Sequence, residues 1–146
     1  MQVLKLYTDG AARGNPGPAG IGAVLMDAEG NILEEISEPL EPTTNNIAEY
    51  TALLRGLEMA AGHSPGRLLI HSDSELMVRQ VMGRYKVKAE HLIDYYRRAV
   101  SILSKFPSFQ LIHVPRSLNS RADHLAASAA QGKKPTPPKT SAAKKI

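Results

Sequence analysis

Four carboxylates stand at positions where they could bind metal ions. Asp9 and Asp73 each follow an apolar strand pattern, and Glu49 and Asp123 fall in the first turns of predicted helices. Clustered carboxylates repel one another unless a cation neutralises them, and their oxygens are ligands that Mg²⁺ and Mn²⁺ prefer. Two such ions about 4 Å apart can activate water and stabilise the leaving oxygen in phosphodiester cleavage. The acids therefore indicate a divalent-metal site suited to phosphoryl chemistry.

Each acid also has a purely structural alternative. Asp9 could begin a turn, and Asp73 could be the N-cap of the helix that follows it. Glu49 comes three residues after Asn46 and could complete a capping box, while Asp123 could favour the dipole of its helix. The functional interpretation gains weight only when the four are taken together.

Hydrophobic periodicity predicts the elements that carry these residues. Residues 10–20 are rich in glycine and proline and are predicted as turns, and residues 41–44 are predicted as a loop. The predicted strands cover residues 3–9, 21–26, 32–36, 67–71 and 109–114, and the predicted helices cover residues 46–61, 74–82, 91–105 and 119–130.

The order of these elements predicts an α/β fold with a mixed sheet flanked by helices. Three successive strands with short links favour an antiparallel meander, and the later strand–helix–strand units place further strands parallel to the first. Ligands of such sheets bind beyond the carboxyl ends of parallel strands. This rule points to Asp9 and Asp73.

Composition excludes several classes of protein. The 146 residues include no cysteine, so disulfide frameworks, thiolate zinc sites and cysteine nucleophiles are ruled out. No apolar run approaches the roughly 18 residues of a membrane helix, and the first residues do not resemble a secretory signal. We expect a cytoplasmic monomer without a membrane partner, with one domain over residues 1–130 and a disordered tail over residues 131–146.

Positive charge is concentrated in two segments. The tail holds five lysines and no acid, which leaves 13 basic and 14 acidic residues in residues 1–130. Inside this body, residues 79–98 carry a net charge of +4 and include Arg84, Lys86 and Lys88. We expect these three side chains to contact phosphates, the alternative being a solvated helix face.

Four segments, in order, resemble the motif regions of type 1 ribonuclease H. They are YTDGAARGNPGPAGIGAVL, TTNNIAEYTALLRGLE, IHSDSELMVRQV and VPRSLNSRADHLA, and the resemblance covers residues 2–130. It implies a five-stranded mixed sheet whose first three strands are antiparallel, and an endonuclease that hydrolyses the RNA strand of RNA–DNA hybrids to 3′-hydroxyl and 5′-phosphate ends. By motif, Asp9, Glu49, Asp73 and Asp123 would hold two Mg²⁺ ions, with Mn²⁺ as a possible substitute.

The resemblance also assigns roles to polar neighbours of the acids. Asn15, Asn45 and Asn46 would contact the minor groove, Thr44 a DNA phosphate, and Ser74 the RNA beside the metals. Short amides suit this task because the wide, shallow minor groove of a hybrid displays 2′-hydroxyls from one strand only. Helix capping alone is the alternative for Asn45 and Asn46.

The chain departs from the family pattern in two places. Many members carry a tryptophan-rich basic protrusion, whereas the corresponding segment GRYKVKAEHL is short and the chain has no tryptophan. Many members also place a histidine in a glycine-containing loop before the last acid. Here that loop is PRSLN. His124 is a poor substitute, since adjacent helical residues point about 100° apart, and we expect Arg116 to meet the phosphate instead.

Two other functions remain open at this point. A non-catalytic hybrid-binding module could share this fold, although binding alone would not require four mutually repelling acids. A DNA-directed nuclease of the same fold is the other alternative. The amides of the RGNPG and TTNN segments favour hybrids over duplex DNA.

Overall fold

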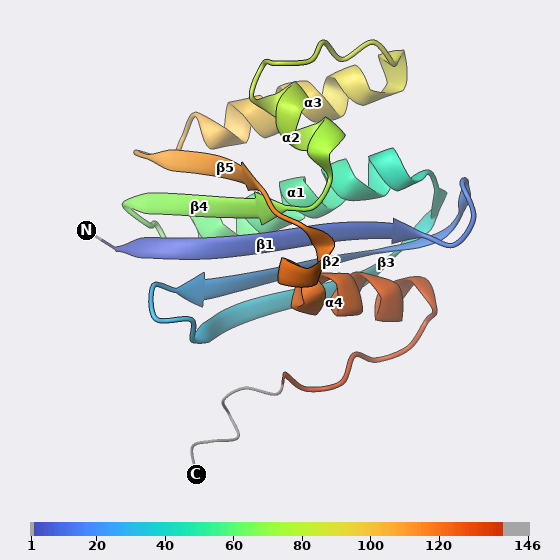
Figure 1. The fold of residues 1–146 in the computed structure, drawn as a ribbon, viewed down its shortest axis with the longest axis horizontal. Coiled ribbons are helices and arrows are strands. Elements are labelled where there is room, and N and C mark those ends of the chain that lie inside the picture. Colours follow the sequence, from blue (N-terminus) through green and yellow to red (C-terminus); the bar gives the residue numbers. More distant parts are fainter. Residues whose placement is uncertain (1, 139–146) are drawn as a thin grey trace.

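Three long strands at the start of the chain form the expected antiparallel meander. They are β1 (Val3–Ala12), β2 (Gly17–Asp27) and β3 (Ile32–Thr43). Two shorter strands, β4 (Arg67–Ser72) and β5 (Phe109–His113), extend the sheet on the other side of β1, and both pairings there are parallel. The computed structural model describes residues 2–138 and gives the strand order β3-β2-β1-β4-β5 (Figure 1).

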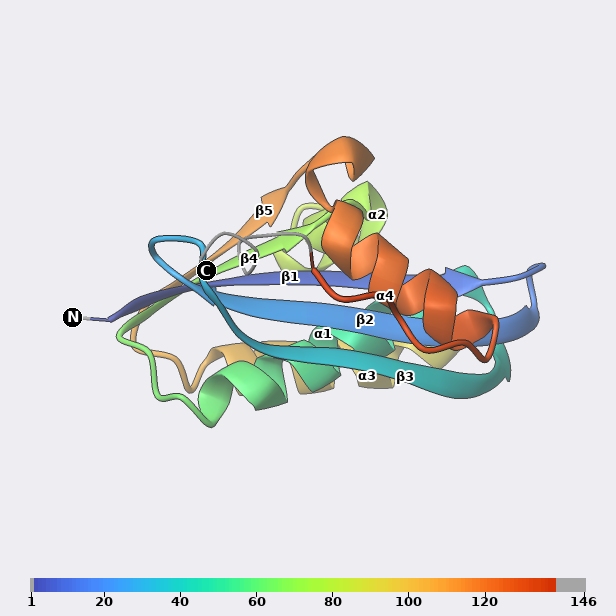
Figure 2. The same cartoon turned by 90° about the horizontal axis from the view of Figure 1, so that it is seen from below.

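Helices cover both faces of this sheet. The helices α1 (Asn45–Ala61), α2 (Glu75–Val81) and α3 (Glu90–Leu103) pack on one face around the larger core. The last helix, α4 (Ser120–Ala130), follows a short 3-10 turn, η1 (Arg116–Leu118), and crosses the opposite face over β2 (Figure 2). The α/β class, the mixed sheet and the antiparallel meander of the sequence analysis are therefore confirmed.

The alternation of side chains along β1 explains the two cores. Leu4 and Leu6 point towards α1 and are fully buried in the larger core. Tyr7 points to the other face, where it joins a smaller cluster that includes Val24 and Leu125 of α4. Successive strand residues face opposite sides of a sheet, so one strand can serve both layers.

The first three strands are longer than predicted. The glycines of residues 10–20 suggested turns, but Gly10 pairs with Ile21 and Gly20 pairs with Ala11 inside the β1–β2 ladder. The segment 41–43, predicted as a loop, continues β3 to Thr43. β3 is an edge strand, and an edge tolerates prolines because one row of its backbone groups is not needed for pairing.

The chain after α4 turns back along that helix. Lys133 N donates to Ser128 O at 2.8 Å. Further on, Thr136 N donates to His124 Nε2 at 3.0 Å, and Thr136 O accepts from Arg121 at 2.7 Å. Residues 139–146 of the tail expected to be disordered lie outside the described residues. None of the helices within residues 2–138 is long and apolar enough to cross a membrane.

Candidate functional site

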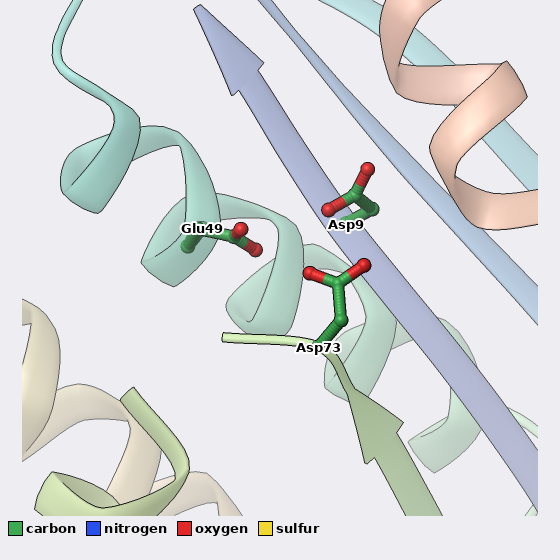
Figure 3. A group of neighbouring side chains, drawn as sticks. All are labelled: Asp9, Glu49 and Asp73. Carbon is green, nitrogen blue, oxygen red and sulfur yellow. The ribbon is translucent and has the colours of Figure 1, made fainter. Parts of the chain in front are cut away.

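The parallel pairing of β1 and β4 brings two of the predicted acids together. Thr8 of β1 and Ser72 of β4 are partners in the ladder, so the next residues, Asp9 and Asp73, lie side by side. Both side chains point into the same region of the carboxyl edge of these strands (Figure 3). Asp9 remains inside the β1–β2 ladder and is only 4% exposed. This arrangement agrees with the rule that ligands bind beyond the carboxyl ends of parallel strands, which pointed to Asp9 and Asp73 in the sequence.

Glu49 reaches the same point from the first turns of α1. A glycine makes this possible, since a Cβ atom on Gly10 would lie 2.2 Å from the carbonyl carbon of Ala48. Without a side chain at this position, the helix backbone packs directly on β1. Gly10 N then donates a hydrogen bond to Glu49 Oε1 at 3.1 Å, which fixes the carboxylate beside Asp9.

The three carboxylates form a compact group of oxygen ligands. One oxygen from each of Asp9, Glu49 and Asp73 lies within 4.8 Å of the other two. Burial, with the charges of Glu49 and Asp73, raises the pKa of Asp9 to about 9. Burial, with the charge of Asp73, raises the pKa of Glu49 to about 8. A divalent cation would remove this repulsion, and three hard oxygen donors suit Mg²⁺ or Mn²⁺.

Capping does not explain these acids. The N-cap of α1 is Thr44, whose hydroxyl accepts from Ile47 N at 3.3 Å, and Glu49 bonds to β1 instead of completing a capping box. The N-cap of α2 is Ser74, whose hydroxyl accepts from Met77 N at 3.3 Å. Asp73 is therefore free of the capping role that its position suggested.

The fourth acid, Asp123, lies beside the group on α4. It is not one of the three acids whose oxygens lie within 4.8 Å of one another, although its carboxyl contributes to the raised pKa of Asp9. Its Oδ1 also accepts a hydrogen bond at 3.1 Å from Arg116, whose side chain is 78% exposed. The guanidinium of Arg116, which we expected to contact a substrate phosphate, is thus hydrogen-bonded to a carboxylate of the site.

Hydrogen bonds and close packing hold α4, which carries Asp123, against the sheet. Arg121 forms a paired hydrogen bond with Glu35 of β3, at 2.7 and 2.8 Å. Ser37 Oγ donates to Leu125 O at 2.7 Å. The helix also packs against a glycine of β2, since a Cβ atom on Gly22 would lie 2.3 Å from a carbonyl oxygen of α4.

Two of the predicted groove amides are hydrogen-bonded to each other and to Ala12, at the same carboxyl end of β1 that carries Asp9. Asn15 Oδ1 accepts from Asn45 N at 3.0 Å, and Asn45 Oδ1 accepts from Ala12 N at 3.0 Å. Both side chains are exposed, as is Asn46. The hydrogen bonds occupy the amide oxygens and orient the NH₂ groups of Asn15 and Asn45, which have no partner within residues 2–138.

Within the basic segment of residues 79–98, the connection between α2 and α3 is fixed to the end of α2 by hydrogen bonds. Arg84 N and Tyr85 N both donate to Arg79 O, at 2.8 and 3.1 Å, and the Arg79 guanidinium lies 5.4 Å from the centre of the Tyr85 ring. Arg84, Lys86 and Lys88 are exposed and form no ion pair with any residue that the structure describes. Arg84 and Lys86 also line a surface hollow of about 500 Å³.

Asn119 lies at the site, although its sequence context did not predict this. Asn119 precedes α4, where an asparagine normally suggests a helix cap. Its amide instead contacts Asp73 Oδ2 at 3.2 Å across the sheet edge. Such a contact between residues 46 positions apart leaves no local signal in the sequence.

Comparisons with known proteins connect this geometry to a family. A family model described as reverse transcriptase-like matches residues 7–129. Ribonuclease HI of Halobacterium salinarum is 41% identical over 120 residues, which cover 82% of this chain and 60% of that protein. Ribonuclease H of Chlorobaculum parvum is 46% identical over 140 residues, covering 86% of this chain and 93% of that protein.

Solved structures agree with these matches. The N-terminal RNase H domain of Rv2228c from Mycobacterium tuberculosis superposes with a TM-score of 0.88 at 38% identity, covering 90% of this chain and 96% of that one. LC11-RNase H1 in complex with an RNA/DNA hybrid gives a TM-score of 0.84 at 42% identity, covering 88% and 97%.

Some relatives are considerably longer than the matched region. The chain spans 60% of the Halobacterium protein and 34% of the mycobacterial bifunctional protein Rv2228c.

Proposed function

Since the chain belongs to the ribonuclease H family of reverse transcriptase-like proteins, we propose that it is an endoribonuclease that hydrolyses the RNA strand of RNA–DNA hybrids. The proposal assigns the activity to residues 1–130, acting as a monomer with two Mg²⁺ ions and leaving 3′-hydroxyl and 5′-phosphate ends. It also treats the basic segment after α2 as a shortened form of the family's protrusion.

The observation that carries the proposal is the meeting of three carboxylates from distant parts of the chain. Asp9, Glu49 and Asp73 offer oxygens within 4.8 Å of one another although none of them caps a helix. Their mutual repulsion is unfavourable in a protein that binds no cation. All four acids come from one chain, so the site does not require residues from a second subunit.

The protein residues have separate tasks in this mechanism. Asp9, Glu49 and Asp73 would hold the metal ions, and Asp123 would complete the set from α4. Two bound divalent ions supply an activated water and neutralise charge on the leaving oxygen. The close contact of α1 with β1 at Gly10 keeps the carboxylates in place, so little rearrangement is needed before the reaction.

Substrate choice would come from the exposed polar residues around the acids. The oriented NH₂ groups of Asn15 and Asn45, together with Asn46, suit hydrogen bonding to 2′-hydroxyls and base edges of a minor groove. Thr44 would contact a DNA phosphate and Ser74 the RNA beside the metals. These contacts require ribose on one strand and fit deoxyribose on the other.

The positively charged side chains would position the phosphate backbone. Arg84, Lys86 and Lys88 have no intramolecular carboxylate partner within the described chain and suit phosphate contacts, which fix register without reading sequence. Arg116 replaces the loop histidine of many relatives. Because its side chain is mostly exposed, it can leave Asp123 for a substrate phosphate when metal ions compete for that carboxylate.

Cleavage of end-labelled substrates tests the proposal directly. The RNA strand of a hybrid should be cut in Mg²⁺ and left intact in EDTA, and neither duplex DNA nor duplex RNA should be cut. Asp9→Asn and Asp73→Asn should each remove most activity, since an amide does not supply the negative charge. Asp94→Asn is the matched control, because this carboxylate is exposed on α3.

Other outcomes identify the alternatives. Equal cleavage of duplex DNA would indicate a DNA-directed nuclease. Tight hybrid binding without cleavage in either Mg²⁺ or Mn²⁺ would indicate a binding module. Near-normal cleavage by both aspartate variants would refute the assignment of the metal site.

A further inference from the structure

Asn119 occupies the junction between η1 and α4, where its backbone N–H and carbonyl groups both form hydrogen bonds. Asn119 N donates to Arg116 O at 2.9 Å, and Asn119 O accepts from Asp123 N at 3.0 Å. An asparagine before a helix usually caps it with its side-chain oxygen. Here the side chain makes no capping bond, so its amide is available for another role.

The amide connects the two strands that carry the central acids. Asn119 Nδ2 donates to Thr8 O at 2.9 Å and to Asp73 Oδ2 at 3.2 Å. Thr8 is the residue before Asp9, so the first bond anchors the amide on β1 at the position where that acid begins. The second bond holds one oxygen of Asp73 while the other remains available.

The burial of this side chain indicates what the amide is for. Asn119 is 1% exposed, and its Oδ1 has no hydrogen-bond partner among the residues described. A buried acceptor without a partner lowers stability, so an apolar residue of similar size would serve better if only packing mattered. The NH₂ group is the part of the side chain that is used. An aspartate of the same shape could not donate these bonds and would repel Asp73.

We propose that Asn119 is a positioning residue for the metal site, acting through Asp73. By donating to Asp73 Oδ2 from a fixed anchor on Thr8 O, it sets the distance between the carboxylates of Asp73 and Asp9. Because it also accepts from Asp123 N, the same residue ties the start of α4 to the edge of the sheet. The inference rests on the proposed metal-dependent function.

Metal affinity of the free protein is the first test. Mn²⁺ binding is followed by electron paramagnetic resonance in the full chain and in Asn119→Ala and Asn119→Leu, which remove the donor without adding charge. Loss of a hydrogen bond that orients a metal ligand typically weakens affinity 10–100-fold, and we expect a loss of about tenfold or more in both variants. Leu103→Val is the control, since it destabilises the distant core without touching the site.

Kinetics separate positioning from a purely structural role. In the two Asn119 variants, the Mg²⁺ concentration for half-maximal cleavage should rise about tenfold, and excess Mg²⁺ should restore much of kcat, while KM for the hybrid stays the same. Leu103→Val should lower the midpoint of thermal unfolding and leave the Mg²⁺ requirement unchanged. Asn119 variants that behave like this control would overturn the proposal.

A measurement on the unaltered protein avoids the risk that a variant fails to fold. The side-chain NH₂ signals of Asn119 should exchange slowly with solvent and should shift when Mg²⁺ is added. Rapid exchange, or signals that do not respond to Mg²⁺, would also overturn the proposal. If the protein binds Mn²⁺ but does not cleave hybrids, the proposed function fails, while the comparison of affinities still decides the role of Asn119.

Discussion

Replacing Gly10 by alanine should disrupt the proposed metal site without removing any of its proposed ligands. The new Cβ would lie 2.2 Å from the carbonyl carbon of Ala48 and 2.5 Å from Glu49 N, and both contacts are with backbone atoms. Carbon atoms pack at about 3.5–4.0 Å, so the start of α1 must move away from β1 by about 1 Å or more. Glu49 moves with it.

The expected loss of stability follows from two contributions. Overpacking of this kind costs about 1–3 kcal/mol. The hydrogen bond from Gly10 N to Glu49 Oε1 contributes about 1 kcal/mol more if it is lost. The free energy of unfolding should therefore fall by about 2–4 kcal/mol, a drop in Tm of roughly 5–15 °C for a chain of this size.

Urea unfolding and Mn²⁺ titration measure the two effects separately. Gly62→Ala is the matched control, because Gly62 ends α1 in a helical conformation and a Cβ there would lie no closer than 3.4 Å to its neighbours. This control should change stability by less than about 1 kcal/mol and leave Mn²⁺ affinity unchanged. A Gly10→Ala protein as stable as the original, with the same Mn²⁺ affinity, would refute the close-approach explanation.

Three further predictions concern charge. In metal-free buffer the free energy of unfolding should fall as pH rises from about 4 to about 9, because folded Asp9 keeps its proton up to a pKa of about 9 and the unfolded carboxyl loses it near 3.8. Urea titrations should find that the free energy of unfolding depends less on pH in Asp9→Asn, and an equal pH dependence in the two proteins would contradict this. At pH 8, Mg²⁺ at about 100 times its Kd should stabilise the protein by about 2.7 kcal/mol for each ion bound, whereas calorimetry at the same Mg²⁺ concentration should detect a smaller gain in Asp9→Asn. Changing Arg84, Lys86 and Lys88 together to glutamine should raise KM severalfold at low salt and leave kcat unchanged, with the difference shrinking as salt rises; a triple variant that matches the original protein at moderate salt would count against phosphate contacts there.

Much of the architecture was predictable because its signals are local. Alternating apolar residues mark the strands, and the short links between the first three strands favour an antiparallel meander. The rule that ligands gather at the carboxyl ends of parallel strands then selects Asp9 and Asp73 from the sequence alone. The predicted topology agrees with the observed pairing of β1 with β4.

The remainder depends on contacts between distant segments. Gly10 and Gly20 resemble turn residues in the sequence, but a helix packs against each of them and the strands continue through. Glu49 matches a capping box, yet its partner is a backbone amide 39 residues away. The amide of Asn119 likewise finds its partners on two other elements. Local patterns describe what a residue can do next to its neighbours, whereas these roles arise only after the sheet has formed.

The position of the acids at the junction between β1 and β4 has a consequence for folding kinetics. The meander is built from contiguous chain, whereas β4 joins β1 across more than 50 residues, a slower kind of contact to form. Asp9 and Asp73 therefore come together only when this long-range pairing is complete. If the pairing forms after the folding transition state, bound metal stabilises the native state and not the transition state, so Mg²⁺ slows unfolding and leaves the folding rate nearly unchanged. Persistence of the folded protein would then depend on the metal supply, while the speed of its folding would not.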